Sequence, residues 1–309
     1  MIEAHDLTKV YGEVRAVDGL SFSVKPGVVT GFLGPNGSGK STTMRMMVGL
    51  DTPTKGYSLI DATPYRALKE PARKVGALLD ARSAHPNRSA RNHLLWQAHA
   101  AGLPTSRVDE VLDLVGLTNV AAKKVGGFSL GMGQRLGIAS AMLGDPEILI
   151  LDEPVNGLDP EGIRWVRSLL KSLAAEGRTI LLSSHLLAEM AQTADHLIVI
   201  GRGKLVADTT VEAFINDNSS VTTLVRTTNP DALENALAAA NIAYTRTTDS
   251  AGRPQWSIEG HTSEEIGELA FNNHLPLSEL SERRATLEDA YMHSTEGHAQ
   301  YTSKETPDA

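Results

Sequence analysis

The chain has 309 residues, of which 41% are hydrophobic and 21% are charged, as in an ordinary globular protein that buries a core. Its 29 basic and 37 acidic residues give a net charge of −8, which argues against nucleic acid as the main partner. The lack of cysteine excludes disulfides, thiolate metal sites and a cysteine nucleophile. His93 and His99 do not have metal-ligand spacing, so we expect them on a helix surface. The length suggests one large and one small domain.

The sequence predicts no segment that enters a membrane. The N-terminal residues, MIEAHDLTKVYG, have neither a basic head nor an apolar run, so we expect no signal peptide. The most apolar stretches, residues 148–151 and 197–200, are far shorter than the ~20 residues that a membrane span needs. We therefore expect a chain that does not itself cross a membrane.

The pattern of apolar residues changes several times along the large domain. Residues 1–30 alternate apolar and polar side chains between glycines, which predicts antiparallel strands. An apolar strand at 28–33 leads into a glycine-rich loop and a helix, and residues 55–61 add another strand. The pattern is helical from 84 to 143. From 148 to 200 strands alternate with helices, which predicts a mainly parallel sheet.

The C-terminal part of the chain has a different organisation. A polar stretch at 216–220 predicts a linker between a large domain at 1–215 and a smaller C-terminal domain. Residues 221–296 fit the order β-α-β-β-α-β, which predicts a small accessory α+β domain of the split βαβ type. Residues 297–309 are polar and are expected to form a frayed tail.

A glycine-rich segment at residues 34–41, which we term the phosphate loop, fits the pattern G-x-x-x-x-G-K-[ST]. Glycines allow backbone N–H groups to surround phosphates, and the helix that follows adds the positive end of its dipole. Lys40 would reach the β/γ-phosphates and the Ser41 hydroxyl would bind Mg²⁺. A chance match is the alternative, but the required strand and helix flank the loop. The predicted nucleotide-binding residues here are Gly34, Pro35, Asn36, Gly37, Ser38, Gly39, Lys40, Ser41 and Thr42.

A second site is predicted where the apolar strand at 148–151 ends in two acids, Asp152 and Glu153. A carboxylate at the end of a buried strand needs a cation nearby, so we expect Asp152 to hold Mg²⁺ together with Ser41. Glu153 is then placed to orient or deprotonate a water near the γ-phosphate. A strand that merely ends in acidic turn residues is the alternative, and the phosphate loop makes it the weaker one.

Further segments carry a family resemblance. The signature segment FSLGMGQR (residues 128–135) precedes the two acids, NGLDP (156–160) follows them, and His185 ends the next strand. With Tyr11 ahead of the phosphate loop, this order resembles the ATP-binding cassette of ABC transporters over about residues 1–215. The stretches VGALLD, HPNRSARNHL, FSLGMGQRLGIA and LEDAYMH look in particular like drug- and antibiotic-exporter ATPases of the daunorubicin- and bacitracin-resistance types.

The resemblance implies that nucleotide is shared between two copies of the chain. Ser129, Gly131 and Met132 would contact the γ-phosphate bound to the other copy, and Asp159 would line the dimer interface. A serine before a helix is also an ordinary helix cap. The usual signature is Leu-Ser-Gly-Gly-Gln, so Leu130 and Met132 are departures from it. We expect the phosphate contact to survive, since it uses the serine, the backbone and the helix end.

The resemblance also implies roles within one copy. Tyr11 would stack on adenine, with an ordinary strand aromatic as the alternative. His185 would contact the γ-phosphate and hold Glu153 and the water in place. Asp80 stands where most cassettes have the Q-loop glutamine, and we expect it to join the metal site directly or through a water. A solvated loop residue is the alternative for Asp80.

Together these features predict the ATP-hydrolysing subunit of an ABC exporter. The expected fold is α/β, a P-loop cassette with a mixed sheet, an antiparallel β subdomain and a helical insert, plus the small C-terminal α+β domain. Two copies would close around two ATP molecules with Mg²⁺ and drive efflux of a small, hydrophobic, drug-like compound. A separately encoded membrane permease would dock around residues 80–91. This predicts a cytoplasmic protein on the inner face of the membrane, with no nucleic-acid partner.

Two alternative functions remain open at this point. One is a soluble ABC ATPase acting on ribosomes or DNA, although translation-factor types usually carry two cassettes and DNA-repair types contain a long coiled coil. The other is an importer ATPase, whose cassette would look similar, so that only the subgroup resemblance favours export. The signature segment and His185 exclude a stand-alone P-loop kinase or switch.

Overall fold

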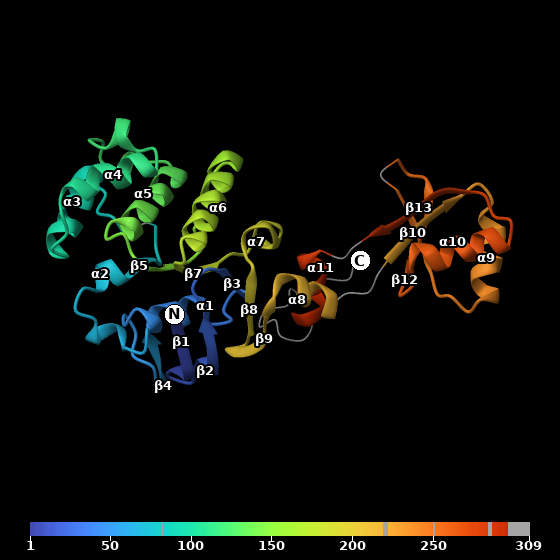
Figure 1. The fold of residues 1–309 in the computed structure, drawn as a ribbon, viewed down its shortest axis with the longest axis horizontal. Helices are drawn as coiled ribbons and strands as arrows, with labels where there is room; N and C mark the ends of the chain where they lie inside the picture. Colours follow the sequence, from blue (N-terminus) through green and yellow to red (C-terminus); the bar gives the residue numbers. More distant parts are fainter. Residues whose placement is uncertain (82, 219–221, 250, 284–285, 296–309) are drawn as a thin grey trace, which may run out of the picture. The chain divides into compact units, whose positions relative to one another are not determined.

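The computed structural model divides the chain into two compact units, one built on Met1–Val211 and one on Glu212–Ser294. The tail predicted at 297–309 lies outside the described residues. The stretch predicted as a linker begins within helix α8 (Val211–Asp217), and its last two residues lie outside the described residues. The structure describes the whole chain except residues 82, 219–221, 250, 284–285 and 296–309 (Figure 1).

The first unit is built around a six-stranded sheet with the strand order β5-β6-β7-β3-β8-β9. The strands from β5 to β8 are parallel, and β9 is antiparallel to β8. Strands β3, β6 and β7 are buried throughout, which is why their sequences are nearly continuous in apolar residues. The predicted mainly parallel sheet is therefore confirmed. The strands are β3 (Val29–Leu33), β5 (Val75–Leu78), β6 (Ile148–Leu151), β7 (Thr179–Ser183), β8 (His196–Gly201) and β9 (Lys204–Thr210).

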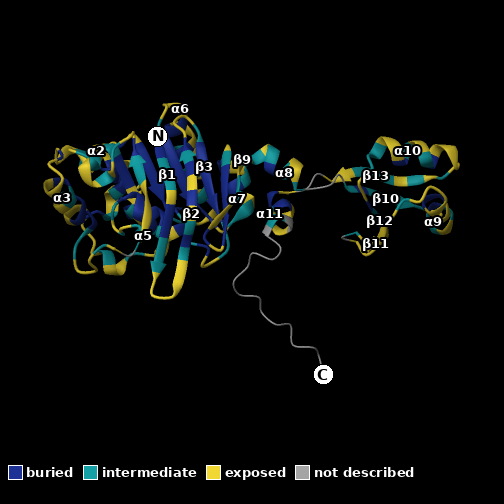
Figure 2. Ribbon diagram, turned by 90° about the horizontal axis from the view of Figure 1, so that it is seen from below, coloured by how far each residue is buried: buried dark blue, intermediate teal, exposed yellow. Residues whose placement is uncertain are grey.

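A three-stranded antiparallel sheet with the order β2-β1-β4 packs against the same core. Its strands are β1 (Ile2–Tyr11), β2 (Val14–Val24) and β4 (Lys55–Ile60). Residues of β1 and β2 share one buried cluster with Phe32 of β3 and with Met44 and Met47 of helix α1 (Lys40–Met47). This cluster holds α1, and with it the end of the phosphate loop, against strands of both sheets. Figure 2 shows the buried parts of β1, β2 and β3 in dark blue.

The helical insert groups three helices at one end of this unit (Figure 1). They are α3 (Ala90–Ala100), α4 (Ser106–Leu114) and α5 (Leu130–Met142). The expectation that His93 lies on a helix surface is wrong, because its side chain is only 5% exposed. His99 is exposed, as expected. The other helices of the unit are η1 (Tyr65–Ala67), α2 (Pro71–Lys74), η2 (Thr118–Val120), η3 (Val125–Gly127), α6 (Pro160–Ala175) and α7 (Leu187–Thr193).

The second unit contains a four-stranded antiparallel sheet with the order β11-β12-β10-β13. Its elements follow the predicted order β-α-β-β-α-β, with the first strand paired between the third and the fourth. Helices α9 and α10 contribute Leu233, Leu237 and Ile266 to a core that includes Trp256. The elements are β10 (Thr222–Thr227), α9 (Pro230–Ala239), β11 (Thr245–Thr248), β12 (Pro254–Glu259), α10 (Ser263–Asn272) and β13 (Leu277–Arg283), followed by α11 (Leu287–Thr295).

Candidate active site

Four neighbouring strands of the six-stranded sheet end at the same edge, because parallel strands point their carboxyl ends in one direction. The phosphate loop follows β3, Asp152 and Glu153 follow β6, His185 follows β7, and Asp80 follows β5. The loops after β5 and β6 are also linked directly, since the backbone N–H of Asp152 donates to the carbonyl of Leu78 at 2.7 Å. The structure thus brings these predicted residues to one edge.

The phosphate loop is shaped by contacts that only glycine permits at one position. Gly39 has a φ of +102°, and a Cβ atom there would lie 2.4 Å from the carbonyl oxygen of Ala16. The backbone N–H of Ser38 donates to the carbonyl of Pro35 at 3.1 Å, which closes a turn within the loop. The buried Ser38 hydroxyl oxygen has no hydrogen-bond partner among the described residues. A tight turn with an unsatisfied hydroxyl fits a loop that receives an anionic, hydrogen-bonding ligand.

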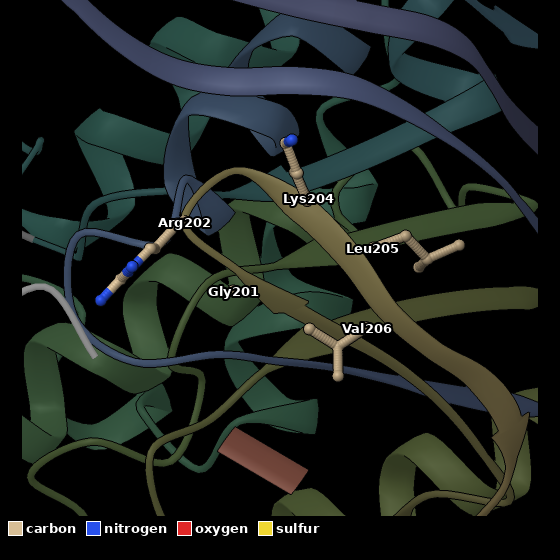
Figure 3. Close-up of a pocket in the computed structure, with 5 residues that line it drawn as sticks. All are labelled: Gly201, Arg202, Lys204, Leu205 and Val206. Carbon is tan, nitrogen blue, oxygen red and sulfur yellow. The ribbon is translucent and has the colours of Figure 1, made fainter. Parts of the chain in front are cut away.

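The hairpin between β8 and β9 holds the phosphate loop through backbone hydrogen bonds. The backbone N–H of Gly203 donates to the carbonyl of Ser38 at 3.0 Å, and the carbonyl of Gly203 accepts from Asp18 at 2.9 Å. The hairpin also lines a pocket of about 500 Å³ with Gly201, Arg202, Lys204, Leu205 and Val206 (Figure 3). None of these five lining residues was predicted for the site. The hairpin therefore contributes to the site through its backbone hydrogen bonds to the phosphate loop.

Lys40 is the cation of the site and is only 9% exposed. Its ammonium group donates to the carbonyl oxygens of Gly34 at 2.6 Å and Pro35 at 3.2 Å. Burial lowers the pKa of Lys40, while the carboxylates of Glu153 and Asp152 act in the opposite direction. A buried cation that interacts with both acids matches the electrostatic arrangement expected for binding a phosphate chain.

Asp152 is held by Ser183, a residue for which the sequence pattern predicted no role. The Ser183 hydroxyl donates to Asp152 Oδ1 at 2.5 Å and accepts from the backbone N–H of Glu153 at 3.0 Å. The register of β6 and β7 explains the contact, because Leu151 pairs with Leu182 and the next two residues are therefore neighbours. A serine at the end of an otherwise apolar buried strand was the only sequence signal for this role.

Glu153 has a strained backbone and several partners. Its φ of +51° lies in the left-handed region, which costs a non-glycine residue ~1–3 kcal/mol. His185 Nδ1 lies 2.7 Å from Glu153 Oε2, and the His185 backbone N–H donates to the same oxygen at 3.3 Å. The side chain of Gln134 donates to the Glu153 carbonyl at 2.8 Å. Gln134 lies in the signature segment, but the sequence pattern predicted no role for it.

Tyr11 lies at the end of β1 and is 47% exposed. Its hydroxyl donates to Asp51 Oδ2 at 3.0 Å, and the same carboxylate accepts from Arg45 of α1 at 2.8 Å. Burial raises the pKa of Tyr11, and the hydrogen bond to Asp51 acts in the same direction. The predicted base-binding tyrosine is therefore linked to the helix that begins at the predicted phosphate loop.

The residues predicted to act on a second copy of the chain are helix caps in this structure. Ser129 Oγ accepts from the backbone N–H of Met132 at 3.2 Å at the start of α5. Asp159 Oδ1 accepts from the backbone N–H of Gly162 at 2.8 Å at the start of α6. Neither cap shares a hydrogen bond with the phosphate loop of its own chain in the part of the molecule that the structure describes.

The start of α5 packs on the loop that carries Asp159. A Cβ at Gly131 would lie 3.1 Å from the carbonyl oxygen of Gly157, and a Cβ at Gly157 would lie 2.2 Å from Leu130 Cδ2. Leu130, which stands in place of the usual glycine, is still 48% exposed. Leucine in place of the usual glycine therefore fills space beside Gly157 and adds an apolar group to an exposed surface.

The parallel sheet, the phosphate loop after β3 and the acids after β6, two strands away, define a P-loop nucleotide-binding protein. Comparisons with known proteins identify its family. Residues 17–156 match the ABC transporter family model, and residues 221–288 match a domain of unknown function. The chain is 47% identical over 211 residues to the bacitracin transport ATP-binding protein BcrA of Bacillus licheniformis. The matched region covers 67% of this chain and 69% of that protein.

Other relatives agree. The chain is 36% identical over 208 residues to the lantibiotic transport ATP-binding protein SrtF of Streptococcus pyogenes, covering 67% of this chain and 90% of that one. Among solved structures, an ATP-binding subunit of an ABC transporter matches with a TM-score of 0.64 and 27% identity over 70% of this chain and 92% of the other. A dimeric bacterial ABC transporter cassette matches with a TM-score of 0.63 and 26% identity over 68% and 98%.

The chain belongs to the ABC transporter family and is one of its ATP-binding, ATP-hydrolysing proteins. The predicted family, the cassette fold and an ATPase of the exporter type are thereby confirmed, and the ribosome or DNA alternative is not favoured. Among the described residues no helix is long and apolar enough to cross a membrane. The roles of individual site residues stay predictions.

Proposed function

We propose that this chain energises the export of a small, hydrophobic, antibiotic-like compound through a separate permease, from the cytoplasmic face of the membrane. Relatives named for bacitracin and lantibiotic transport support the class of compound. A relative named for Nod factor export, from Burkholderia orbicola and 37% identical, supports the direction. The observation that carries the proposal is the meeting of Lys40, Asp152, Glu153 and His185 at one sheet edge.

In this proposal the phosphate loop and Tyr11 bind opposite ends of ATP. The backbone N–H groups of residues 34–39 and the N-terminus of α1 would contact the phosphates, and Lys40 would neutralise the β/γ end. The ring of Tyr11 would stack on adenine. The hydrogen bond from Tyr11 to Asp51, a carboxylate bound by Arg45 of α1, supports this pairing because it joins the two binding elements.

The donor chemistry at the sheet edge fits Mg²⁺. The Ser41 hydroxyl and the Asp152 carboxylate are oxygen ligands of the kind that this ion prefers. Within the described residues, no three His, Asp or Glu side chains gather closely enough to hold a metal by themselves. Phosphate oxygens and waters would therefore complete the site, and the bound ion would neutralise charge on the phosphates. Asp80, which follows the next strand, would join through a water.

Glu153 and His185 are the residues proposed to carry the hydrolytic step. Glu153 would orient the attacking water and accept its proton, because its carboxylate is fixed by two contacts from His185. The other ring nitrogen of His185, Nε2, would contact the γ-phosphate. Ser183 would hold Asp152 and the Glu153 backbone in register during this step.

The ATP site would be completed by a second copy of the chain. Ser129, Gly131 and Met132 lie at the N-terminus of α5, where the helix dipole favours an anion, but they form no hydrogen bond with the phosphate loop of their own chain among the described residues. Asp159 would line the same interface. The match to a dimeric cassette supports the pairing of two copies.

The permease would dock on a groove beside the helical insert. A hollow of about 480 Å³ overlaps the region predicted for docking and extends to Asn92, Ala122 and Lys124. Its walls are held together by backbone hydrogen bonds from Ala90 to Lys123 and from Val125 to Arg88. Such a preformed polar groove suits a short helix of another protein. The lining residues are His85, Asn87, Arg88, Ser89, Asn92, Ala122 and Lys124.

The proposal is tested by purifying the chain from its own membranes and reconstituting it in vesicles with the membrane protein that accompanies it. ATP hydrolysis should rise when labelled bacitracin is added, and the label should move away from the face that carries the ATPase. Lys40→Ala should abolish both signals, while the exposed Lys55→Ala should abolish neither. Movement toward the ATPase face would indicate an importer, and association with ribosomes instead of a membrane protein would contradict the proposal.

A further inference from the structure

A chain of three polar side chains connects Tyr11 to helix α1. The Tyr11 hydroxyl donates to Asp51 Oδ2 at 3.0 Å. Arg45 grips the same carboxylate with two donors, Nε to Oδ2 at 2.8 Å and Nη2 to Oδ1 at 3.2 Å. A bidentate guanidinium fixes the plane of the carboxylate, so the acceptor for the tyrosine hydroxyl has a defined position.

The backbone around α1 explains why these groups meet. Arg45 lies in the last turn of α1, and its carbonyl accepts from the backbone N–H groups of Leu50 at 2.9 Å and Asp51 at 3.3 Å. The chain therefore folds back at the end of the helix and places Asp51 beside Arg45. Because α1 begins at Lys40, the same helix carries the phosphate-binding end of the site and the anchor for Tyr11.

The charges in this group favour a stable anchor. The hydrogen bond from Arg45 lowers the pKa of Asp51, so its carboxylate is ionised at neutral pH and remains an acceptor. Lys9 lies with its ammonium group 4.9 Å from the centre of the Tyr11 ring, and that ammonium donates to the carbonyl of Thr52 at 2.7 Å. The ring is thus restrained both at its hydroxyl and on one face.

We propose that Asp51, held by Arg45, is a positioning residue that fixes the ring of Tyr11 at a set distance from the phosphate loop, so that α1 acts as the common frame for base and phosphate recognition. The inference rests on the proposed stacking of Tyr11 on adenine. It predicts that loss of the anchor weakens ATP binding through the base alone. The contacts with the phosphates should not change.

The test compares ATP with inorganic triphosphate, which has no base, on the full chain. Tyr11→Phe keeps the ring and removes the hydroxyl, and Asp51→Ala removes the acceptor. Each should raise the Kd for ATP about threefold, the effect expected for one partly exposed hydrogen bond. The double variant should be no weaker than either single variant, since both remove the same contact. Affinity for triphosphate should match that of the parent chain, because triphosphate has no base to contact the ring.

Two further variants separate the possible failures. Tyr11→Ala should weaken ATP binding more than Tyr11→Phe does, because it removes the ring as well. Asp109→Ala serves as the control, since Asp109 is also a carboxylate bound by two donors of one arginine, Arg91, although it is more exposed than Asp51. It should leave ATP affinity unchanged.

The outcomes are distinguishable. If Tyr11→Ala binds ATP as well as the parent does, the stacking proposed for Tyr11 is wrong and the anchor has no purpose. If Tyr11→Ala weakens ATP binding but Tyr11→Phe does not, stacking stands and the inference is overturned. If Asp51→Ala weakens triphosphate binding as much as ATP binding, Asp51 supports α1 rather than Tyr11, which also overturns it. Tyr11→Phe keeps the test valid should Asp51→Ala fail to fold.

Discussion

Gln134, in the second turn of α5, donates a hydrogen bond from its side chain to the backbone carbonyl of Glu153 at 2.8 Å. This bond joins the helix that begins with the signature segment to the residue proposed to activate water. It also supports a backbone that is held at a φ of +51°. The signature segment therefore has a structural role within its own chain, in addition to the role proposed for it on a second copy.

Replacing Gln134 with leucine should lower kcat without changing the KM for ATP. The Glu153 carbonyl would lose one of its two donors and keep the backbone N–H of Asn156 at 3.1 Å. Loss of one hydrogen bond costs ~0.5–1.5 kcal/mol, which corresponds to a roughly two- to tenfold fall in rate if it displaces Glu153. Steady-state ATPase kinetics measure both constants. Gln97→Leu, the same substitution on α3 of the helical insert, is the control. An unchanged kcat in Gln134→Leu would show that Glu153 keeps its position without this bond.

Arg167 links helix α6, which follows Asp159, to helix α7, which follows His185. On α6 it forms an ion pair with Glu189 of α7 and a hydrogen bond from Nη1 to Gln192 Oε1 at 2.5 Å. Since α7 begins two residues after His185, Arg167→Ala should loosen the His185 contact to Glu153 and lower kcat several-fold. Arg164→Ala is the matched control, because Arg164 lies on the same helix and bonds only its own Pro160 carbonyl among the contacts described.

Exchanging the two charges of the Arg167–Glu189 ion pair tests whether the pair positions His185 or only stabilises the fold. The double variant Arg167→Glu with Glu189→Arg should recover part of the kcat lost in either single variant. The midpoint of thermal unfolding, measured alongside, reports folding independently of rate. Failure of the exchange to restore kcat while it restores stability would indicate that the ion pair serves packing of α6 on α7 and not the hydrolytic site.

Acid should weaken the helical insert through His93. Burial lowers the pKa of His93, and the nearby Arg88 acts in the same direction. The unfolded chain therefore binds a proton more readily than the folded one, so the free energy of unfolding falls as the pH drops below the ordinary histidine pKa of about 6.5. His93→Leu should reduce the loss of thermal stability between pH 7.5 and 5.5. The exposed His99→Leu should leave that loss unchanged, and an equal effect of both would contradict the assignment.

Much of the site could be predicted because its parts are local in sequence. The phosphate loop is one continuous segment, and Asp152, Glu153 and His185 each come shortly after an apolar strand. Strands of a parallel sheet deliver the residues after them to a common edge, so recognising the strands was enough to bring these groups together. The accessory unit could be predicted for a similar reason, since its strands and helices alternate in a simple order.

The residues missed are those whose partners are distant in the chain. Ser183 contacts Asp152 only because β6 and β7 pair in one register. Gln134 reaches Glu153 only because α5 packs on β5, the strand beside β6. Asp51 contacts Tyr11 across 40 positions of sequence. The burial of His93 was missed because the order of residues along α3 does not by itself show which face of the helix meets its neighbours.

The central claim is that two copies of this chain enclose ATP and hydrolyse it with Glu153. The most direct measurement is the mass of Glu153→Gln in solution, by light scattering, with and without ATP and Mg²⁺. Because glutamine keeps the shape of the side chain but cannot accept the proton, ATP should be bound, remain intact and hold the chains as a dimer. The exposed Glu161→Gln should hydrolyse ATP and return to monomer. A Glu153→Gln chain that binds ATP yet hydrolyses it at the parent rate and stays monomeric would contradict the account.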